Sequence, residues 1–557
     1  MTLATANSAR NTAEMTGGEA IVRALVANGV DTLFGLPGAQ MYPFFDALHR
    51  HSDAIRTVGA RHEQACAYMA FGHARSTGQP GVFSVVPGPG VLNTFAALAT
   101  AAGCCAPVLC VTGQVPTAFI GKGRGHLHEL PDQRATLRQV CKWAERIESV
   151  ADAPAIVDEA FRQMLSGRPG PVAIEMAWDV MAAKGEVEIL PRATIPAAPP
   201  PDREAIAKTA DLLAGAKHPM LFLGSGAQGA VAEVRALCEM LGMPAVAFRG
   251  GRGIVPESST LGLSCYAGFL AWPEVDVALG VGTRMELPYM RWSNMMTLMD
   301  APQAPPHIIR MDIDPEEMTR LRPHTAVVAD AVAGLRALIE ALRERGVTRE
   351  DISWTAPAKA EASREITSVK PHIDYLNVIR AALPDDGFFV EELCQAGFTS
   401  YFGYDVRAPR TYVSAGFQGT LGFGFMTALG VKAANPDRPV VSIAGDGGFL
   451  FGVQELATAA QYGLGVVVIV FNNGAYGNVL RDQDMRFGGR VIGAELTNPD
   501  FMTLAKAFGI AGHRVDSPEA LSRVLPDALA ADRPTLIEVT VDRASEVIPW
   551  RFVHPQR

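Results

Sequence analysis

Short apolar runs alternate along this chain with longer segments of helical composition, and glycines or polar residues separate the two. A short apolar run bounded by turn residues is typical of a buried β-strand. Strands that alternate with helices predict a parallel sheet whose faces the helices cover. In the first third of the chain the predicted strands are 32–34, 57–60, 81–86, 107–112 and a final one at 170–178, and the predicted helices are 18–28, 64–77 and one from Val91.

Two stretches interrupt the alternation and divide the chain. Residues 190–202 are rich in Pro and Ala, and residues 346–370 are charged and weakly patterned, so both are interpreted as linkers. We therefore predict an α/β protein of three consecutive domains at residues 1–185, 203–345 and 371–557, each with a parallel, helix-flanked sheet. The first and third domains are comparable in size, which suggests a duplicated architecture.

Composition narrows the class of protein. Hydrophobic residues make up 48% and charged residues 19% of the 557-residue chain, which is typical of a compact globular protein. The net charge of −9 and the lack of a dense Lys/Arg run argue against nucleic acid or an anionic membrane as a partner. No apolar run reaches the length of a membrane span, and residues 1–15 predict a loose tail. The eight cysteines form no CxxC pattern, so we expect reduced thiols in a cytoplasmic enzyme.

The most informative stretch is 440–480, which predicts a strand, a tight glycine turn, a helix and a second strand. In a parallel βαβ unit both strand ends reach the same sheet edge, so Asp446 and Asn473 should converge. Carboxylate and amide oxygens are ligands that Mg²⁺ prefers, and the N–H groups of Gly447 and Gly448 favour an anion. The stretch therefore predicts a Mg²⁺-diphosphate site. Its predicted elements are the strands 440–444 and 465–471 and the helix 449–462.

A second candidate site lies in the first domain, where the sequence 61–64, RHEQ, joins a strand to a helix. A lone Glu at a helix start is normally only a favourable charge at the positive end of the helix dipole. Here the helix after Glu63 consists largely of small and apolar residues, and a glycine-rich turn at 85–90 follows the next strand. Both turns lie at carboxyl ends of strands, where α/β sheets bind ligands, so we favour a functional Glu63.

The GDG turn followed by an Asn-Asn pair resembles the signature of thiamine diphosphate (ThDP) enzymes. Nearly the whole chain resembles their acetolactate synthase-like group, of the pyruvate oxidase and benzoylformate decarboxylase type. The resemblance implies an N-terminal pyrimidine-binding domain, a central Rossmann-like domain and a C-terminal diphosphate-binding domain. The matching segments are GLPGAQMYPFFDAL at Gly35, RHEQA at Arg61, GPG with Asn93, VTGQVP at Val111, GTLGFG at Gly419, and GDGGF through NNGAYG from Gly445.

Residue roles follow from the resemblance. Glu63 would hydrogen-bond the aminopyrimidine ring and promote its imino tautomer, with Gln114 and His128 as further catalytic residues. His128 lies in a basic loop with His126, and a plain surface histidine is an equally good interpretation. The implied magnesium ligands are Asp446, Asn473 and the Ala475 carbonyl. The implied cofactor-binding residues are Pro37, Gly38, Gly88, Asn93, Gln395, Gly419, Leu421, Gly445, Gly447, Gly448, Asn473, Tyr476 and Gly477.

The implied activity is ThDP- and Mg²⁺-dependent decarboxylation of a 2-oxo acid, with pyruvate as first candidate, and carboligation to a second carbonyl. Such enzymes place Glu63 and the GDG unit across a subunit interface, which implies a homodimer or homotetramer. Asn478, Arg481 and Asp482 depart from the apolar and Gln-Trp residues of true acetohydroxyacid synthases, which weakens an assignment to branched-chain biosynthesis. A non-ligating benzoylformate-type decarboxylase and a 2-hydroxyacyl-CoA or benzaldehyde lyase therefore stay open.

The central domain contains GSGAQG at 224–229, a pattern found in dinucleotide-binding turns. About 20 residues on, Arg249 stands where a nicotinamide ribose needs an acid, so tight helix packing explains the glycines better than a dehydrogenase does. The resemblance also allows FAD or ADP in this domain, with Arg284 as a contact and Asp312 at the end of its last strand. The apolar segment 548–552 either covers an active site or simply docks on the core.

Overall fold

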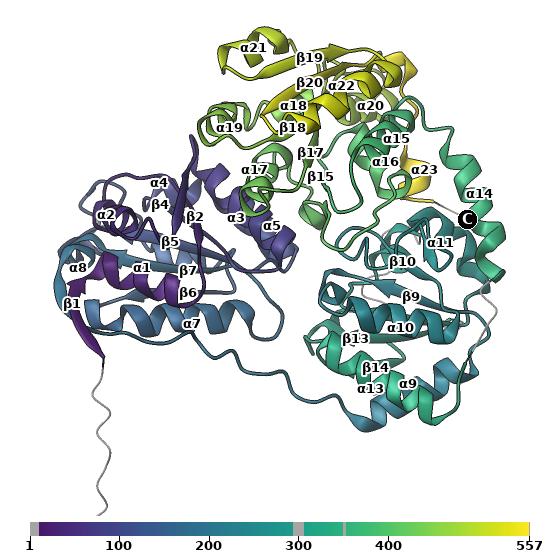
Figure 1. The fold of residues 1–557 in the computed structure, drawn as a ribbon, viewed down its shortest axis with the longest axis horizontal. Coiled ribbons are helices and arrows are strands. Elements are labelled where there is room, and N and C mark those ends of the chain that lie inside the picture. Colours follow the sequence, from purple (N-terminus) through teal and green to yellow (C-terminus); the bar gives the residue numbers. More distant parts are fainter. Residues whose placement is uncertain (1–10, 293–305, 349–352, 556–557) are drawn as a thin grey trace, which may run out of the picture. The chain divides into compact units, whose positions relative to one another are not determined.

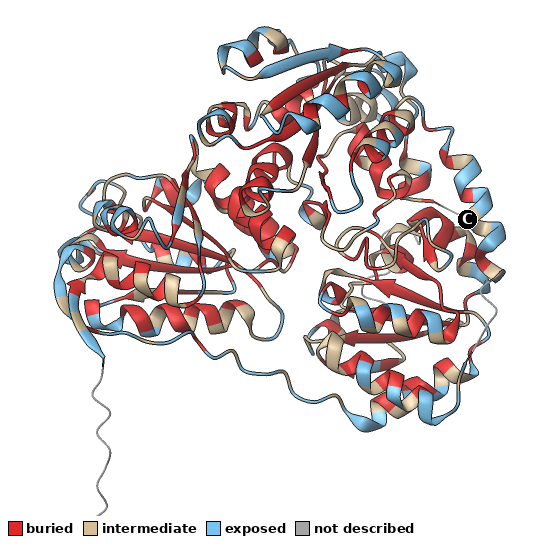
Figure 2. Cartoon of the chain, viewed as in Figure 1, coloured by how far each residue is buried: buried red, intermediate tan, exposed pale blue. Residues whose placement is uncertain are grey.

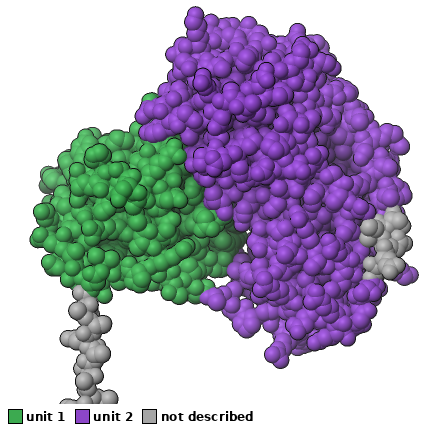
Figure 3. All heavy atoms as spheres, viewed as in Figure 1, with its two compact units in different colours: residues 1–74, 78–196 green, residues 75–77, 197–557 purple. Residues whose placement is uncertain are grey.

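The computed structural model describes residues 11–292, 306–348 and 353–555. Two compact units make up the chain, residues 1–74 with 78–196, and residues 75–77 with 197–557 (Figure 3). The first unit holds one six-stranded parallel sheet and the second holds two, each flanked by helices (Figure 1). This confirms the predicted α/β class with three parallel sheets.

The sheet of the first unit has the strand order β3-β2-β4-β5-β7-β6. Its inner strands β4, β5 and β7 are buried along their whole length, as their apolar runs predict (Figure 2). The strands are β2 (Thr32–Gly35), β3 (Arg56–Gly59), β4 (Gly81–Val85), β5 (Val108–Gln114), β6 (Trp143–Ile147) and β7 (Val172–Ala177); the main helices are α1 (Gly17–Ala27), α2 (Tyr42–Arg50), α3 (Glu63–Thr77), α5 (Phe95–Gly103) and α7 (Ala153–Leu165).

Two sequence predictions for this unit are wrong. The strand predicted at 170–178 does not end the domain, because α8 (Trp178–Ala182) and β8 (Lys184–Glu188) follow it. Within the predicted tail, β1 (Thr12–Thr16) pairs antiparallel with β8 to form a separate two-stranded sheet. Only Met15 is buried among the residues of β1, so the apolar pattern there is too weak to predict a strand.

The central sheet has the order β11-β10-β9-β12-β13-β14, the order of a Rossmann fold. Asp312 ends β13, but β14 follows, so the prediction that Asp312 marks the last strand is wrong. The strands are β9 (Pro219–Leu223), β10 (Ala245–Ala247), β11 (Gly262–Leu263), β12 (Val277–Val281), β13 (His307–Asp312) and β14 (Thr325–Val328); the main helices are α9 (Arg203–Gly215), α10 (Val231–Leu241), α11 (Cys265–Ala271) and α13 (Ala331–Glu344).

The two predicted linkers differ in the structure. Residues 190–202 form neither helix nor strand, as predicted. The second stretch, 346–370, contains the helix α14 (Ala356–Ile366), and part of it lies outside the described residues. Ala362 and Ile366 pack in the same apolar core as α11. Burial of these two side chains stabilises a helix that the charged, weakly patterned sequence does not predict.

The third sheet has the order β16-β15-β17-β18-β20-β19. In sequence order its first strand, β15, lies between the second and the third. The sheet of the first unit has the same arrangement around β2, so the two sheets share one topology. The strands are β15 (Phe388–Val390), β16 (Tyr412–Val413), β17 (Val440–Gly445), β18 (Val466–Asn472), β19 (Ala511–Val515) and β20 (Thr535–Thr540); the main helices are α15 (His372–Ala382), α16 (Gln395–Gly403), α17 (Gly424–Ala434), α20 (Gly477–Arg486), α22 (Pro518–Ala530) and α23 (Trp550–Val553).

The single helix predicted at 449–462 is wrong. The chain there forms α18 (Asp446–Phe449), a 3₁₀ turn (Val453–Glu455) and α19 (Leu456–Tyr462). Glycine lowers helix stability, and Gly452 lies at the break between α18 and the 3₁₀ turn, so the predicted helix is interrupted there. The helical end is as predicted, because Gly463 caps α19 in the left-handed region at φ 61°.

A buried carboxylate holds the turn that precedes α17. Glu392 follows β15 and accepts hydrogen bonds from the backbone N–H of Gly422 at 2.9 Å and of Gly424 at 2.8 Å. Burial raises the pKa of Glu392 to about 8, although these N–H donors oppose the rise. Burial also raises the pKa of its neighbour Glu391 to about 7. Both acids therefore couple the stability of this domain to pH.

A second buried charge joins the central sheet to α16 within the second unit. The guanidinium of Arg252 is inaccessible to solvent, forms an ion pair with Glu257 at 2.7 Å and lies 4.4 Å from the centre of the Tyr412 ring. It also donates hydrogen bonds to the carbonyl oxygens of Ser400 and Tyr404. These contacts leave the charge fully partnered in an apolar setting.

In the cofactor-free protein we expect Glu391 and Glu392 to add to the free energy of unfolding at low pH, and to lose that contribution as the pH rises from about 4.5 to about 8. In that window folded Glu391 and Glu392 keep protons that the unfolded chain has released, so rising pH favours unfolding by up to about 1.4 kcal/mol per pH unit for each group. Thermal midpoints measured against pH check this. In Glu391→Gln this contribution is absent, so the difference in midpoint between wild type and variant should change across the window, and a variant profile parallel to the wild type would contradict the assignment.

Replacing Arg252 by Met should lower the free energy of unfolding by about 3 kcal/mol or more, because Glu257 would keep a buried charge without its partner. The matched control is Arg336→Met, which removes an exposed ion pair with Glu233 and should cost less than about 1 kcal/mol. Denaturant unfolding of both variants measures the difference. Equal losses would show that the Arg252 pair is not a stabilising contact.

Candidate active site

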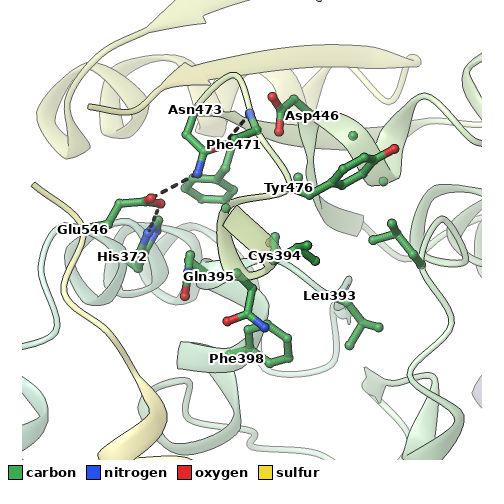
Figure 4. A pocket seen from close by; sticks show the side chains of 18 residues that line it. His372, Leu393, Cys394, Gln395, Phe398, Asp446, Phe471, Asn473, Tyr476 and Glu546 are labelled. Atoms are coloured by element: carbon green, nitrogen blue, oxygen red, sulfur yellow. Dashed lines mark hydrogen bonds and ion pairs between the residues drawn. The ribbon is translucent and has the colours of Figure 1, made fainter. Parts of the chain in front are cut away.

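A cavity of about 210 Å³ lies in the second unit where β15, β17 and β18 end (Figure 4). Strand β15 has β16 on one side and β17 on the other, so the loops after β15 and β17 diverge there and leave a crevice. Such a switch point is the usual ligand site of an open parallel sheet. The sequence-predicted residues that line the cavity are Gln395, Leu421, Gly445, Asp446, Gly447, Gly448, Asn473, Ala475, Tyr476 and Gly477.

The parallel register explains why Asp446 and Asn473 meet. Gly445 of β17 lies opposite Phe471 of β18, so the residues that follow each strand emerge at one edge. Asp446 is 2% exposed, and its Oδ2 accepts a hydrogen bond from Asn498 Nδ2 at 2.7 Å. Burial raises the pKa of Asp446, and the Asn498 hydrogen bond opposes that rise.

The donor set fits a divalent metal that carries a diphosphate. A carboxylate (Asp446), an amide oxygen (Asn473) and a main-chain carbonyl (Ala475) line the cavity, and these are hard oxygen ligands. Among the described residues no three His, Cys, Asp or Glu side chains cluster as a metal site, so a zinc-type centre has no support there. The chemistry of the lining suits Mg²⁺ with phosphate oxygens completing its shell.

The glycine turn lets neighbouring side chains approach its backbone closely. A Cβ at Gly447 would collide with the ring of Tyr476, and one at Gly448 would lie 3.2 Å from Leu421 Cδ1. Gly447 and Gly448 line the cavity together with Tyr476 and Leu421, and larger residues at the two glycine positions would displace these neighbours. Gly419 adopts the left-handed conformation, with φ 57°, two residues before Leu421.

The first unit gathers its own candidate residues at the carboxyl edge of its sheet. Glu63 is the first residue of α3, and its Oε2 accepts a hydrogen bond from Asn93 Nδ2 at 3.0 Å. The helix starts there because His62 caps it, with Nδ1 accepting from the backbone N–H of Gln64. Two turns meet nearby, since a Cβ at Gly38 would lie 2.5 Å from Val86 Cγ1. Pro37 is exposed in the first of these turns.

His128 lies in the same cluster. Its Nδ1 is 2.7 Å from Gln40 Oε1, and its carbonyl oxygen occupies the space beside Gly88. Burial lowers the pKa of His128, while the negative charge of Glu63 opposes that change. The structure thus brings His128, Gly88 and Glu63 together. His126 instead packs against Phe119, with the two rings tilted by 45° and their centroids 4.7 Å apart.

Gln114, at the end of β5, is buried, and its side-chain amide forms hydrogen bonds with other residues of the first unit. Its Nε2 donates to Glu175 Oε2 at 3.3 Å, and its Oε1 accepts from the backbone N–H of Val115 at 2.8 Å. A catalytic role for Gln114 stays a prediction.

Sequence reasoning missed several residues of the site, and four of them contact its polar or aromatic groups, His372, Phe398, Asn498 and Glu546. Three of them line the cavity, and Asn498 bonds Asp446. No local sequence pattern marks them, because the approach of Glu546 depends on the parallel pairing of β18 with β20, in which Asn472 lies opposite Thr540. The segment after β20 therefore emerges beside Asn473 and brings Glu546 to the cavity.

The glycine turn of the central domain has a packing explanation. A Cβ at Gly226 would lie 2.8 Å from the backbone Cα of Gly282, and one at Gly224 would overlap the same turn. Arg249 is engaged by Glu286 at 3.3 Å. These contacts favour tight packing over a nicotinamide site. The guanidinium of Arg284 lies 4.0 Å from the centre of the Phe417 ring.

The C-terminal segment docks on the second unit. Phe552 is buried against Tyr266 and Phe402, with ring centroids 4.7 and 4.9 Å apart. Trp550 packs on Phe398 and donates its indole N–H to Asn478 Oδ1 at 3.1 Å. The segment therefore docks on the core, and Trp550 contacts two residues that line the cavity without lining it itself.

Within the described residues, no helix is both long and apolar enough to cross a membrane.

Profiles of thiamine pyrophosphate enzymes match three segments of the chain. The N-terminal TPP binding domain matches residues 15–136, the central domain matches 206–338, and the C-terminal TPP binding domain matches 394–539.

Relatives match along nearly the whole chain. A probable 2-ketoarginine decarboxylase of Pseudomonas aeruginosa is 34% identical, over 94% of this chain and 94% of its own length. A probable acetolactate synthase large subunit of Methanocaldococcus jannaschii is 33% identical, over 96% and 93%. The large subunit of acetolactate synthase isozyme 1 of Escherichia coli is 31% identical, over 96% and 95%. The chain therefore belongs to the thiamine pyrophosphate enzymes and is an enzyme of their acetolactate synthase-like group.

Proposed function

We propose that the protein decarboxylates a 2-oxo acid, with pyruvate as first candidate, and joins the remaining fragment to a second carbonyl, using ThDP and Mg²⁺. The observation that carries this proposal is the cavity in which Asp446, Asn473 and the glycine turn meet. When bound, ThDP supplies a nucleophilic carbon that adds to the 2-oxo group and accepts the electrons released with CO₂.

The residues of the chain would bind and orient the reacting groups. Asp446, Asn473 and the Ala475 carbonyl would hold Mg²⁺, and Gln395 with the backbone of Gly447 and Gly448 would line the diphosphate. The Leu421 side chain, beside Gly448, would shape the cofactor. These roles are consistent with the lining of the cavity.

The cluster of the first unit would activate the cofactor. Glu63 would hydrogen-bond the aminopyrimidine, while Asn93 holds one oxygen of its carboxylate. His128, with a lowered pKa, would be neutral near pH 7 and able to accept a proton from an incoming or leaving group.

We propose a homodimer or homotetramer as the active assembly. We also propose FAD or ADP in the central domain as a further cofactor, to be tested by absorbance.

A second candidate is decarboxylation without ligation of a 2-oxo acid that carries a cationic tail. The relative from Pseudomonas aeruginosa is a probable 2-ketoarginine decarboxylase. Within the described part of the chain, the cavity lining includes Glu546 and Asp446 but neither Lys nor Arg. Asp446 and Glu546 are already assigned to Mg²⁺ and to Asn473, so the support is that this lining, with no Lys or Arg among its described residues, does not repel a cationic tail.

Glu63→Gln should abolish turnover and leave ThDP binding largely intact, because a carboxamide cannot exchange a proton with the aminopyrimidine ring. We expect a loss of at least about 100-fold in kcat. Steady-state kinetics and calorimetric titration of ThDP measure the two effects. Asp446→Ala serves as the contrast, since it should lose ThDP and Mg²⁺ together, and substantial turnover by Glu63→Gln would disprove the proposed role.

Incubation with ThDP, Mg²⁺ and a panel of 2-oxo acids should release CO₂ and give a product one carbon shorter than the sum of two substrates. The panel includes pyruvate, 2-oxobutyrate, benzoylformate and a guanidino-substituted 2-oxo acid, and mass spectrometry identifies the products. Aldehyde alone from the guanidino acid would favour the second candidate. An enzyme that binds ThDP but releases no CO₂ from any member would exclude both.

A further inference from the structure

We propose that Glu546 is a positioning residue that fixes the side-chain amide of Asn473 with its oxygen toward the metal position. The inference rests on the proposed Mg²⁺-ThDP function and adds a residue that the ligand set does not include. Glu546 lies beyond β20, lines the same cavity as Asn473 and is mostly buried, with a side chain 10% exposed (Figure 4).

The Asn473 amide is held at both ends. Its Nδ2 donates a hydrogen bond to Glu546 Oε2 at 3.0 Å, and its Oδ1 accepts one from the backbone N–H of Ala475 at 3.1 Å. A flipped amide would place the NH₂ group against the Ala475 N–H and the oxygen against a carboxylate. One orientation therefore has two good contacts and the other has two repulsive ones. In the observed orientation Oδ1 keeps a lone pair for a metal.

Glu546 is itself held from the other side. His372 Nε2 lies 2.9 Å from Glu546 Oε1, and the His372 side chain is 1% exposed. Each oxygen of the carboxylate therefore has its own donor, an imidazole N–H for one and the Asn473 amide for the other. A carboxylate that links a buried histidine to a metal ligand is the kind of contact that orients ligands in metal sites.

The backbone on both sides of the contact is also fixed. The N–H of Val547 donates to the carbonyl of Lys370 at 2.9 Å, so the residue after Glu546 is tied to the start of α15. A Cβ at Gly477 would lie 2.8 Å from Asn473 Nδ2, so only glycine leaves the amide its place. The position of Glu546 is thus set by the fold and does not depend on a bound metal.

The test titrates Mg²⁺ by calorimetry into full-length protein that is free of divalent metal and saturated with ThDP. Glu546→Ala should weaken Mg²⁺ binding about 10- to 100-fold. Glu546→Gln should restore it, because the Gln oxygen can still accept from Asn473 Nδ2 while its NH₂ group faces His372. If Glu546→Ala does not fold, Glu546→Asp, whose shorter side chain cannot reach both partners, should show the same direction of loss.

Trp550→Phe is the matched control, because Trp550 lies in the same segment but bonds Asn478 and not Asn473. It should bind Mg²⁺ as the wild type does. Mg²⁺ affinity unchanged in Glu546→Ala, or lowered equally in Trp550→Phe, would overturn the inference. A Gln variant as weak as the Ala variant would also overturn it, since charge and not orientation would then matter. Wild-type protein that binds neither ThDP nor Mg²⁺ would overturn the proposed function as well.

Discussion

The parallel register of β17 and β18 is the constraint on which the site depends. Because Gly445 lies opposite Phe471, a carboxylate and an amide that are distant in sequence reach one edge of the sheet. The neighbouring strand β15 ends at the same edge and brings Glu392 and Gln395. A shift in this register would separate Asp446 from Asn473.

Most of the sheet strands are predictable from sequence because they are short apolar runs between glycines and polar turns. The failures have physical causes. Strand β1 buries only Met15, and α14 is stabilised by tertiary burial of Ala362 and Ile366, so neither has a strong local pattern. The helix predicted at 449–462 is interrupted near Gly452, because glycine disfavours a continuous helix.

The residues of the βαβ motif are predictable from the sequence, whereas the residues that reach the cavity from elsewhere are not. Asp446, Asn473 and the glycines belong to a compact motif, so their meeting follows from the βαβ topology alone. Glu546 and His372 lie far from that motif in sequence, and neither has a distinctive neighbourhood. Their approach depends on the pairing of β18 with β20 and on the start of α15, which only the full fold defines.

The position of Glu546 beyond β20 has a consequence for how the protein is made. A chain that grows from its N-terminus can pair β17 with β18, and so bring Asp446 and Asn473 together, well before Glu546 leaves the ribosome. Until the segment after β20 is in place, the Asn473 amide lacks the partner of its NH₂ group and can rotate. An ordered amide at the cavity is therefore acquired late in synthesis, after the sheet that carries it.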